Sequence, residues 1–326
     1  MRPSLFVLAV ILALPLQGRA AYPERPITLI VPFAAGGPTD VVARIVGEHM
    51  SRTLGQQVVV ENVAGAGGTT GSTRAAQATP DGYTLIMGHM GTHGAAPAVY
   101  PDLKYDPAKS FQPIGMAAGT PILVVAKKSF PAKDLREFVA YLKKNSEKLN
   151  EAHAGVGSVS FTTCAFFNSL IGAKPTRVVY RGTGPALNDL VSGQVDYMCD
   201  QIVNLVPQIQ AGTIKAYGVA LPQRSPALPD VPTTKEGGLP EFQVSAWNAI
   251  FAPKGTPPEV VKKLSDALTK ALADENTRKR LLDLGADLSD KAAQTPEGLA
   301  KLVDSEVARW KKVLASVSRD AAPPAK

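Results

Sequence analysis

Strand-like and helix-like segments alternate along most of the chain, and this alternation limits the possible folds more than any other feature. Residues Ile27–Val31 form an unbroken apolar run, typical of a strand buried on both faces. From Thr39 onward, apolar residues recur at helical spacing until Met50. The same succession repeats up to about residue 220, and two helices are expected at the end, from Pro257 and from Pro296. Such alternation predicts an α/β fold with parallel sheets.

The length of the chain argues for two lobes. A single sheet of this kind seldom needs 326 residues. We expect residues 22–122 together with 244–326 to form the first lobe, and residues 123–243 to form the second. The chain would cross between them near Pro121–Val124 and again within residues 222–245. Each lobe is predicted to be a mostly parallel sheet flanked by helices.

The N-terminus has the pattern of a secretory signal peptide. Arg2 precedes an apolar stretch from Leu5 to Leu16, and small residues follow up to Ala21. The apolar stretch is shorter than the roughly 20 residues that a membrane-spanning helix needs. We therefore predict that residues 1–21 are removed and that the remaining chain is exported.

The charge is moderately basic, with 35 Lys and Arg against 28 Asp and Glu, a formal net charge of +7. Nucleic-acid binding calls for clustered basic residues interleaved with aromatic ones. Here the basic residues lie mainly on predicted helices, as expected of solvated helix faces. The sequence predicts no nucleic-acid partner, while a mild positive charge helps to attract an anionic solute.

The chain has two cysteines, Cys164 and Cys199. Exported proteins can keep disulfides. One interpretation is a bridge between a residue early in a helix and a residue at the end of a strand; the other is two buried thiols that never meet. The first is favoured.

A glycine-containing loop, "VPFAAGGPTD", links the first strand to the first helix. Free N–H groups and the helix dipole at such a place favour an anion, and Thr39 or Asp40 can cap the helix. The loop matches neither a dinucleotide fingerprint nor a P-loop, so a nucleotide is unsupported. A plain strand–turn–helix connection is the alternative interpretation.

Two further loops, in the predicted second lobe, carry hydroxyl groups at helix starts. Ser158, Ser160 and Thr162 lie in "GVGSVSFTTC", and Arg181 and Thr183 lie in "YRGTGPALNDL". Strand-end loops that face each other from two lobes form a cleft suited to a small anion.

Candidates for metal binding and catalysis are few. His89 and His93 have the spacing of two zinc ligands on a helix, but Gly91 and Gly94 argue against a helix there. We predict no metal and no cofactor. Asp200 is a lone acid at a strand end, where it would cap a helix, lie on the surface or accept hydrogen bonds from a ligand.

Taken together, four stretches resemble a known family: "YPERPITLIVPFAAGGPTD", "VVVENVAGAGGTTGSTRAAQATPDGYTL", "DVPTTKEGGLPEF" and "APKGTPPEVVKKL". They are similar to the Bug receptors, the extracytoplasmic solute-binding proteins of tripartite tricarboxylate transporters. The resemblance extends from about Tyr22 to about Val317. It implies a monomeric periplasmic protein with a two-lobed, type II-like binding fold. Such a protein closes around a small organic acid and delivers it to the membrane subunits of a transporter.

The resemblance also implies a set of ligand-binding residues. They are Phe33, Ala35, Gly36, Gly37 and Asp40 in the first lobe, and Ser158, Ser160, Phe161, Thr162, Arg181, Thr183 and Asp200 in the second. Relatives often carry histidine where this chain has Phe161, which predicts a more apolar ligand. Trp247 is expected either to line the cleft near the hinge or to pack in the core.

Two other functions stay open at this point. A receptor of this kind could signal to a membrane sensor instead of feeding a transporter. A hydrolase using Ser160 and His153 is disfavoured because the chain has no G-x-S-x-G elbow. Dicarboxylates, tricarboxylates, acidic amino acids and aromatic acids all suit the expected cleft.

Overall fold

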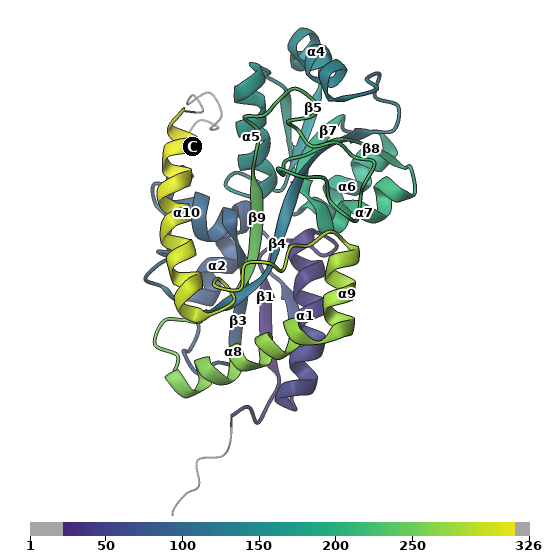
Figure 1. Cartoon of the computed structure of the whole chain (residues 1–326). Coiled ribbons are helices and arrows are strands. Elements are labelled where there is room, and N and C mark those ends of the chain that lie inside the picture. Colours follow the sequence, from purple (N-terminus) through teal and green to yellow (C-terminus); the bar gives the residue numbers. More distant parts are fainter. Residues whose placement is uncertain (1–21, 317–326) are drawn as a thin grey trace, which may run out of the picture.

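The computed structural model describes residues 22–316, so the predicted signal peptide lies outside the described residues. Strands and helices alternate as expected (Figure 1). The strands are β1 Ile27–Val31, β2 Val58–Asn62, β3 Thr84–His89, β4 Phe111–Lys127, β5 Asn150–His153, β6 Thr176–Val179, β7 Tyr197–Gln201, β8 Ile214–Val219 and β9 Ser245–Pro253. The helices are α1 Pro38–Leu54, α2 Thr69–Ala76, α3 Ala96–Val99, α4 Leu135–Asn145, α5 Val159–Ile171, α6 Thr183–Ser192, α7 Ile202–Gln210, α8 Pro258–Ala273, α9 Glu275–Asp283 and α10 Pro296–Ser316.

The strands form two groups joined by one long strand. The order is β2-β1-β3-β9-β4-β7-β5-β6, and β8 also pairs with β4. The pairs β1–β2, β1–β3, β5–β6 and β5–β7 are parallel, whereas β9 and β4 run antiparallel to their partners β3 and β7. The first lobe is built on β1, β2, β3 and β9, and the second on β5, β6, β7 and β8 (Figure 1). The predicted two-lobed α/β fold is confirmed, and its sheets are mixed, because β4 and β9 run antiparallel to every strand with which they pair.

Strand β4 belongs to both lobes. Its residues from Phe111 to Pro121 pair with β9, and those from Ile122 to Lys127 pair with β7 and β8. The change of partner falls beside the predicted crossing at Pro121–Val124. The exact residue boundaries proposed for the lobes stay a prediction.

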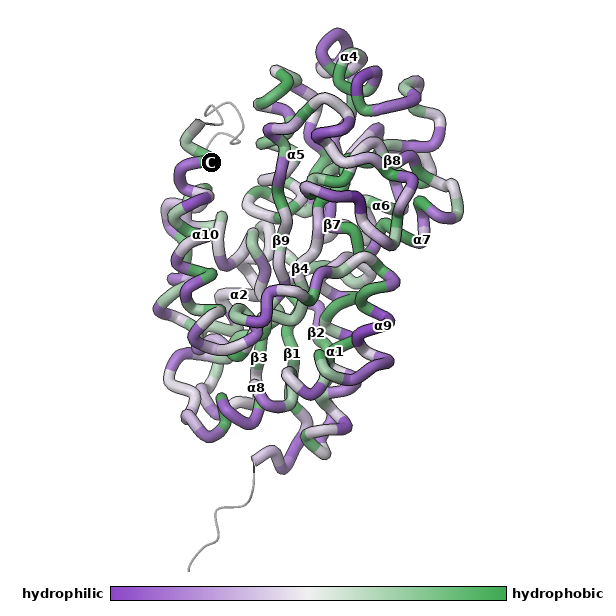
Figure 2. The backbone as a smooth tube through the Cα atoms, viewed as in Figure 1, coloured by the Kyte–Doolittle hydropathy of each residue, from purple (hydrophilic) through white to green (hydrophobic). Residues whose placement is uncertain are grey.

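Apolar residues cover both faces of the first sheet. Ile27, Leu29 and Val31 of β1 pack into a core with α1 and α8, while Ile30 packs into a second core on the opposite face. Hydrophobic segments accordingly run along the strands, and hydrophilic residues lie on the outer faces of helices such as α8 and α9 (Figure 2). Burial on both faces explains why β1 reads as an unbroken apolar run.

A disulfide braces the second lobe. Cys164 in α5 and Cys199 in β7 are bonded, with their Cα atoms 5.2 Å apart. The predicted bridge is confirmed, and the alternative of two separate thiols is wrong.

Two sequence predictions of helices are wrong. The C-terminal part holds three helices, because Asp274 ends α8 and its carboxylate then caps α9 by accepting a hydrogen bond from the Thr277 amide at 2.8 Å. The stretch after His89 is also helical: a π-helical turn at Gly91–Ala95 leads directly into α3. Within residues 22–316, no helix is both long enough and apolar enough to span a bilayer.

Candidate ligand-binding site

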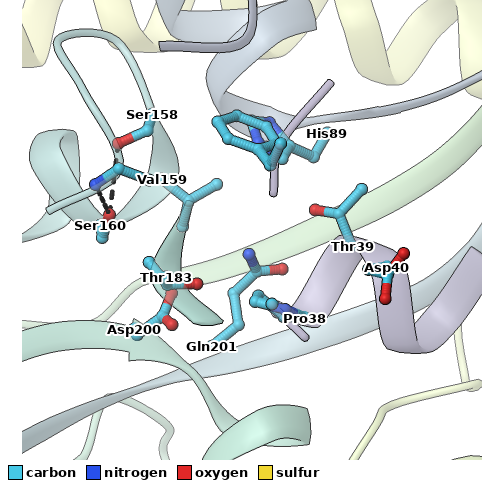
Figure 3. Close-up of a pocket in the computed structure, with 13 residues that line it drawn as sticks. Pro38, Thr39, Asp40, His89, Ser158, Val159, Ser160, Thr183, Asp200 and Gln201 are labelled. Atoms are coloured by element: carbon cyan, nitrogen blue, oxygen red, sulfur yellow. Dashed lines mark hydrogen bonds between the residues drawn. The ribbon is translucent and has the colours of Figure 1, made fainter. Parts of the chain in front are cut away.

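A small cavity lies where strand-end loops of the two lobes face each other (Figure 3). We call its first-lobe side the first wall, formed by Phe33, Gly37, Pro38, Thr39, Asp40 and His89. Its second-lobe side, the second wall, is formed by Ala154, Ser158, Val159, Ser160, Thr183, Asp200 and Gln201. The cavity offers about 20 Å³ to the centre of a water molecule, which is room for about one water. The walls therefore have to separate before an organic acid enters.

The two lobes also touch each other through residues outside the cavity lining. The Ala34 amide of the first lobe donates to the Arg181 carbonyl of the second at 3.0 Å. Nearby, the Tyr100 hydroxyl lies 2.7 Å from the Val156 carbonyl. These contacts join residues of different lobes, so the arrangement is a closed one.

The first wall is a loop followed by a helix N-terminus. Gly36 has φ of 82°, which a residue with a Cβ rarely adopts. Gly37 is the N-cap of α1 and Pro38 is the first helical residue. No side chain in the described part of the chain caps the start of this helix, so the expectation that Thr39 or Asp40 would do so is wrong. Unbonded N–H groups at this end favour negative charge in the cavity.

Asp40 holds this loop in place from behind. Its carboxylate accepts hydrogen bonds from the Gly36 amide at 3.1 Å, from Arg44 at 2.9 and 3.0 Å, and from Asn62 at 2.9 Å. The Asn62 amide also donates to the Phe33 carbonyl at 3.0 Å. Burial by itself raises the pKa of Asp40, but these hydrogen bonds outweigh it and hold the pKa below its usual value. The carboxylate is thus occupied by the protein.

His89 completes the first wall at the end of β3. Its ring stacks on Phe33, with centroids 4.8 Å apart. The Thr92 amide donates to His89 Nδ1 at 3.0 Å, which places the proton of the neutral ring on Nε2. Burial lowers the pKa of His89 to about 4, so the ring is neutral at physiological pH. Within residues 22–316, no group of three or more His, Cys, Asp or Glu side chains is placed to hold a metal ion.

Hydroxyl groups supply the second wall. Ser158 is the N-cap of α5 and accepts a hydrogen bond from the Phe161 amide at 3.2 Å. Its oxygen lies 3.2 Å from that of Ser160, which accepts from the Ala154 amide at 3.0 Å. His153 Nδ1, considered above for a hydrolase, accepts from the Gly155 amide at 3.1 Å. These bonds fix the loop that bears the hydroxyls.

Asp200 is the acid of the second wall and is 1% exposed. Burial raises its pKa to about 6, against hydrogen bonds from the main-chain N–H of Gln201 and from the side chains of Thr183 and Asn204, which lower it. The Asn204 amide nitrogen lies 3.2 Å from Asp200 Oδ2. A carboxyl with such a pKa is easily protonated when an anion comes near.

The structure places the sequence-predicted residues in two groups. Phe33, Gly37, Asp40, Ser158, Ser160, Thr183 and Asp200 line the cavity, whereas Ala35, Gly36, Phe161, Thr162, Arg181 and Trp247 are not among the lining residues. The Phe161 ring packs against His153 at 5.1 Å. The Thr162 hydroxyl donates back to the Ser158 carbonyl. Trp247 is buried, and its indole donates to Glu306 at 3.3 Å.

Three further lining residues, Pro38, Thr39 and Val159, lie within the two predicted loops, whereas His89, Ala154 and Gln201 were not predicted. A signal for His89 was present, because it ends a strand that pairs in parallel with β1. Parallel strands end at the same edge, so His89 had to lie near the glycine loop. For Gln201 the only signal was its position next to Asp200.

Comparison with known proteins identifies the family. Residues 42–318 match the model of the tripartite tricarboxylate transporter family receptors. The structure is similar to MatC from Rhodopseudomonas palustris with bound malate, at 52% identity and a TM-score of 0.87, covering 90% of this chain and 100% of that one. It is also similar to the periplasmic binding protein BugD, at 43% identity and a TM-score of 0.88, covering 91% of this chain and 98% of that one. R. palustris Rpa4515 with adipate is similar at 32% and 0.86, again covering 91% and 98%.

This family consists of solute-binding receptors, which confirms the predicted Bug-type binding protein over the hydrolase alternative. The chain belongs to the family of tripartite tricarboxylate transporter receptors.

Proposed function

We propose that this receptor captures a small carboxylate-bearing organic acid in the cavity and delivers it to the membrane subunits of a tripartite tricarboxylate transporter. The observation that carries the proposal is the pair of walls, which bring N–H and hydroxyl groups from two lobes onto one cavity. Related receptors of known structure hold malate and adipate, which supports a carboxylate ligand.

The two walls have different roles in this proposal. Main-chain amides from Gly37 onward, at the N-terminus of α1, receive a carboxylate, while the Gly36 amide is held by Asp40. The Ser160 hydroxyl donates from the opposite side, and the Thr183 hydroxyl does so when Asp200 is protonated and no longer accepts its hydrogen bond. The walls are supported by residues that do not line the cavity: Ala35, Phe161, Thr162 and Arg181 in the same loops and elements as the lining residues, and Trp247 in the core. Residues 22–122 with 244–326, and residues 123–243, are the units that close around the ligand.

The location and partners of the chain follow from the same proposal. Residues 1–21 direct export and are removed, and the receptor works in the periplasm as a monomer. A ligand stabilises the closed arrangement only by binding it more tightly than the open one. The membrane subunits recognise this closed, ligand-bound arrangement.

A thermal-shift panel followed by calorimetry tests the proposal. The panel holds malate, adipate, a tricarboxylate, an acidic amino acid and an aromatic acid, and at least one acid is expected to raise the melting temperature. Thr183→Val should then lower the affinity for that acid by at least about tenfold, since a hydrogen bond to a charged group contributes about 1.5–3 kcal/mol. Thr176→Val, at an exposed position of β6, is the control. The proposal fails if no acid binds, or if both variants bind like the wild type.

A further inference from the structure

Gln201 is a buried residue in the second wall whose amide faces the cavity. It ends β7, is 2% exposed and pairs in register with Ile122 of β4. In Figure 3 its amide lies in the middle of the labelled side chains, with the nitrogen directed into the space bordered by Val159 and His89. The donor side of the amide therefore points toward the position of a ligand.

Two residues of the crossing strands fix the other side of this amide. The Thr120 hydroxyl of β4 donates to Gln201 Oε1 at 2.6 Å, and the Asn248 amide of β9 donates to the same oxygen at 2.7 Å. Both residues are fully buried. An amide oxygen has two acceptor sites, and both are filled here, so the NH₂ group is the part left for the cavity.

The reverse orientation is less favourable. Turning both amides would let Gln201 donate to Asn248 and would place the Gln201 oxygen at the cavity. Asn248 Oδ1 has no hydrogen-bond partner within residues 22–316, so the turned Asn248 would put its NH₂ group in that buried place. Buried donors without a partner are rarer than buried carbonyls without one, which favours the orientation described above.

We propose that Gln201 is a specificity-determining residue that presents a fixed, uncharged N–H donor to an acceptor oxygen of the ligand, with Thr120 and Asn248 as its positioning residues. The inference rests on the proposed function and refines it. An acceptor oxygen can belong to a carboxylate, a carbonyl or a hydroxyl, whereas an ammonium group would meet the Gln201 N–H with a second donor. The ligand end beside Gln201 is therefore an oxygen-bearing one.

The test is Gln201→Glu, which has the same shape and keeps the oxygen that Thr120 and Asn248 bind. It replaces the donor with a carboxylate oxygen. The probe is the acid that most raises the melting temperature of the wild type in the panel, and its affinity is measured by calorimetry at pH 7.5. We expect a loss of at least about tenfold, the effect of one hydrogen bond to a charged group. Gln194→Glu adds the same charge at an exposed position of the second lobe and should change the affinity less than twofold.

A second pair of variants tests the positioning and keeps the proposal falsifiable if Gln201→Glu does not fold. Thr120→Val removes one hydrogen bond to the Gln201 amide oxygen and should lower the affinity for the probe severalfold. Thr120→Ser keeps the hydroxyl and should bind the probe with wild-type affinity. If no acid binds the wild type, the proposed function fails and this inference fails with it. If an acid binds and Gln201→Glu binds it as well as Gln194→Glu does, or better, only this inference is overturned. Equal binding by Thr120→Val and Thr120→Ser overturns the positioning role.

Discussion

The two walls of the cavity both present hydrogen-bonding groups, but the groups are of different kinds. The first wall offers main-chain amides on a glycine loop, and the network around Asp40 and Arg44 fixes that loop from behind. The second wall offers side chains, namely hydroxyls, a carboxyl and an amide, on elements joined by a disulfide. A wall made of backbone depends on local conformation, whereas a wall made of side chains depends on residues brought from elsewhere in the fold. Perturbing each wall should therefore have a different result.

The largest effect is expected from the disulfide, which braces only the second wall. Cys164→Ala with Cys199→Ala removes a link across 35 residues and should lower the free energy of unfolding by about 3–4 kcal/mol on the chain-entropy account. Urea unfolding monitored by circular dichroism measures this. Dithiothreitol should destabilise the wild type and leave the variant unchanged. An equal response of both proteins to the reductant would contradict the prediction.

The next effect concerns the acid of the second wall. Burial raises the pKa of Asp200 to about 6 in the folded chain, against the ordinary value of 3.8 that applies to the unfolded chain. Asp200 therefore binds more protons when folded, and its contribution to stability is complete below pH 3.8 and is lost as the pH rises to about 6. The pKa difference corresponds to about 3 kcal/mol. Asp200→Asn should gain that much stability relative to the wild type between pH 4 and pH 7.

The stability of the wild type has to be compared with that of Asp200→Asn at each pH, because buried histidines change the free energy of unfolding with pH in the opposite direction. Burial lowers the pKa values of His89 and His153 to about 4 and that of His93 to about 3. These rings favour the folded state at neutral pH and disfavour it in acid. They are present in both proteins, so their contributions cancel in the difference. A difference that does not change with pH would show that Asp200 titrates normally.

A smaller effect is expected behind the first wall. Asp40→Asn replaces one acceptor oxygen by an NH₂ group that faces other hydrogen-bond donors. It should lower the free energy of unfolding by about 1.5–3 kcal/mol and reduce the affinity for the acid that binds the wild type. Its charge-matched control is Glu48→Gln on the same helix, where the carboxylate pairs with Arg52 and Arg280 at the surface. Surface ion pairs contribute about 0–1 kcal/mol, so this control should stay close to the wild type in both urea unfolding and calorimetry. Equal losses in the two variants would argue against a role of Asp40 in holding the loop.

The difference between the walls also explains what could be predicted from the sequence. The loop at Gly36 and Gly37 is encoded locally, by an apolar strand, two glycines and an amphipathic helix in direct succession. The orientation of the Gln201 amide is set by Thr120 and Asn248, which lie 81 and 47 residues away. No pattern within a short window can indicate such a contact.

The same limit applies to the fold. The apolar run "PILVVAK" is typical of a strand and indicates the second half of β4, whereas no such run indicates its first half or β9, which pair with each other through register shifts. Gly91 was interpreted as a helix breaker. A Cβ there would lie 2.6 Å from the Gly157 carbonyl of the second lobe, so glycine is required by a close approach between lobes, and the helical turn forms around it.

The smallest and most specific perturbation acts where the walls meet. A Cβ on Gly184, in the first turn of α6, would lie 2.4 Å from the Ala35 carbonyl in the loop that leads into the first wall. Gly184→Ala should therefore oppose closure by about 1–3 kcal/mol, a loss of affinity of roughly 5- to 150-fold. Within its own lobe the change replaces a helical glycine by alanine, which favours the helix by about 0.5–1 kcal/mol, so the free energy of unfolding should stay level or rise. Gly47→Ala in α1, where the nearest atom is Val58 Cγ1 at 3.5 Å, should leave affinity unchanged. Calorimetry, urea unfolding and small-angle scattering at saturating ligand separate the two effects, since the variant should bind weakly and remain more extended. A parallel loss of stability and affinity would mean that the contact at Gly184 holds the second lobe together and does not limit how closely the walls approach.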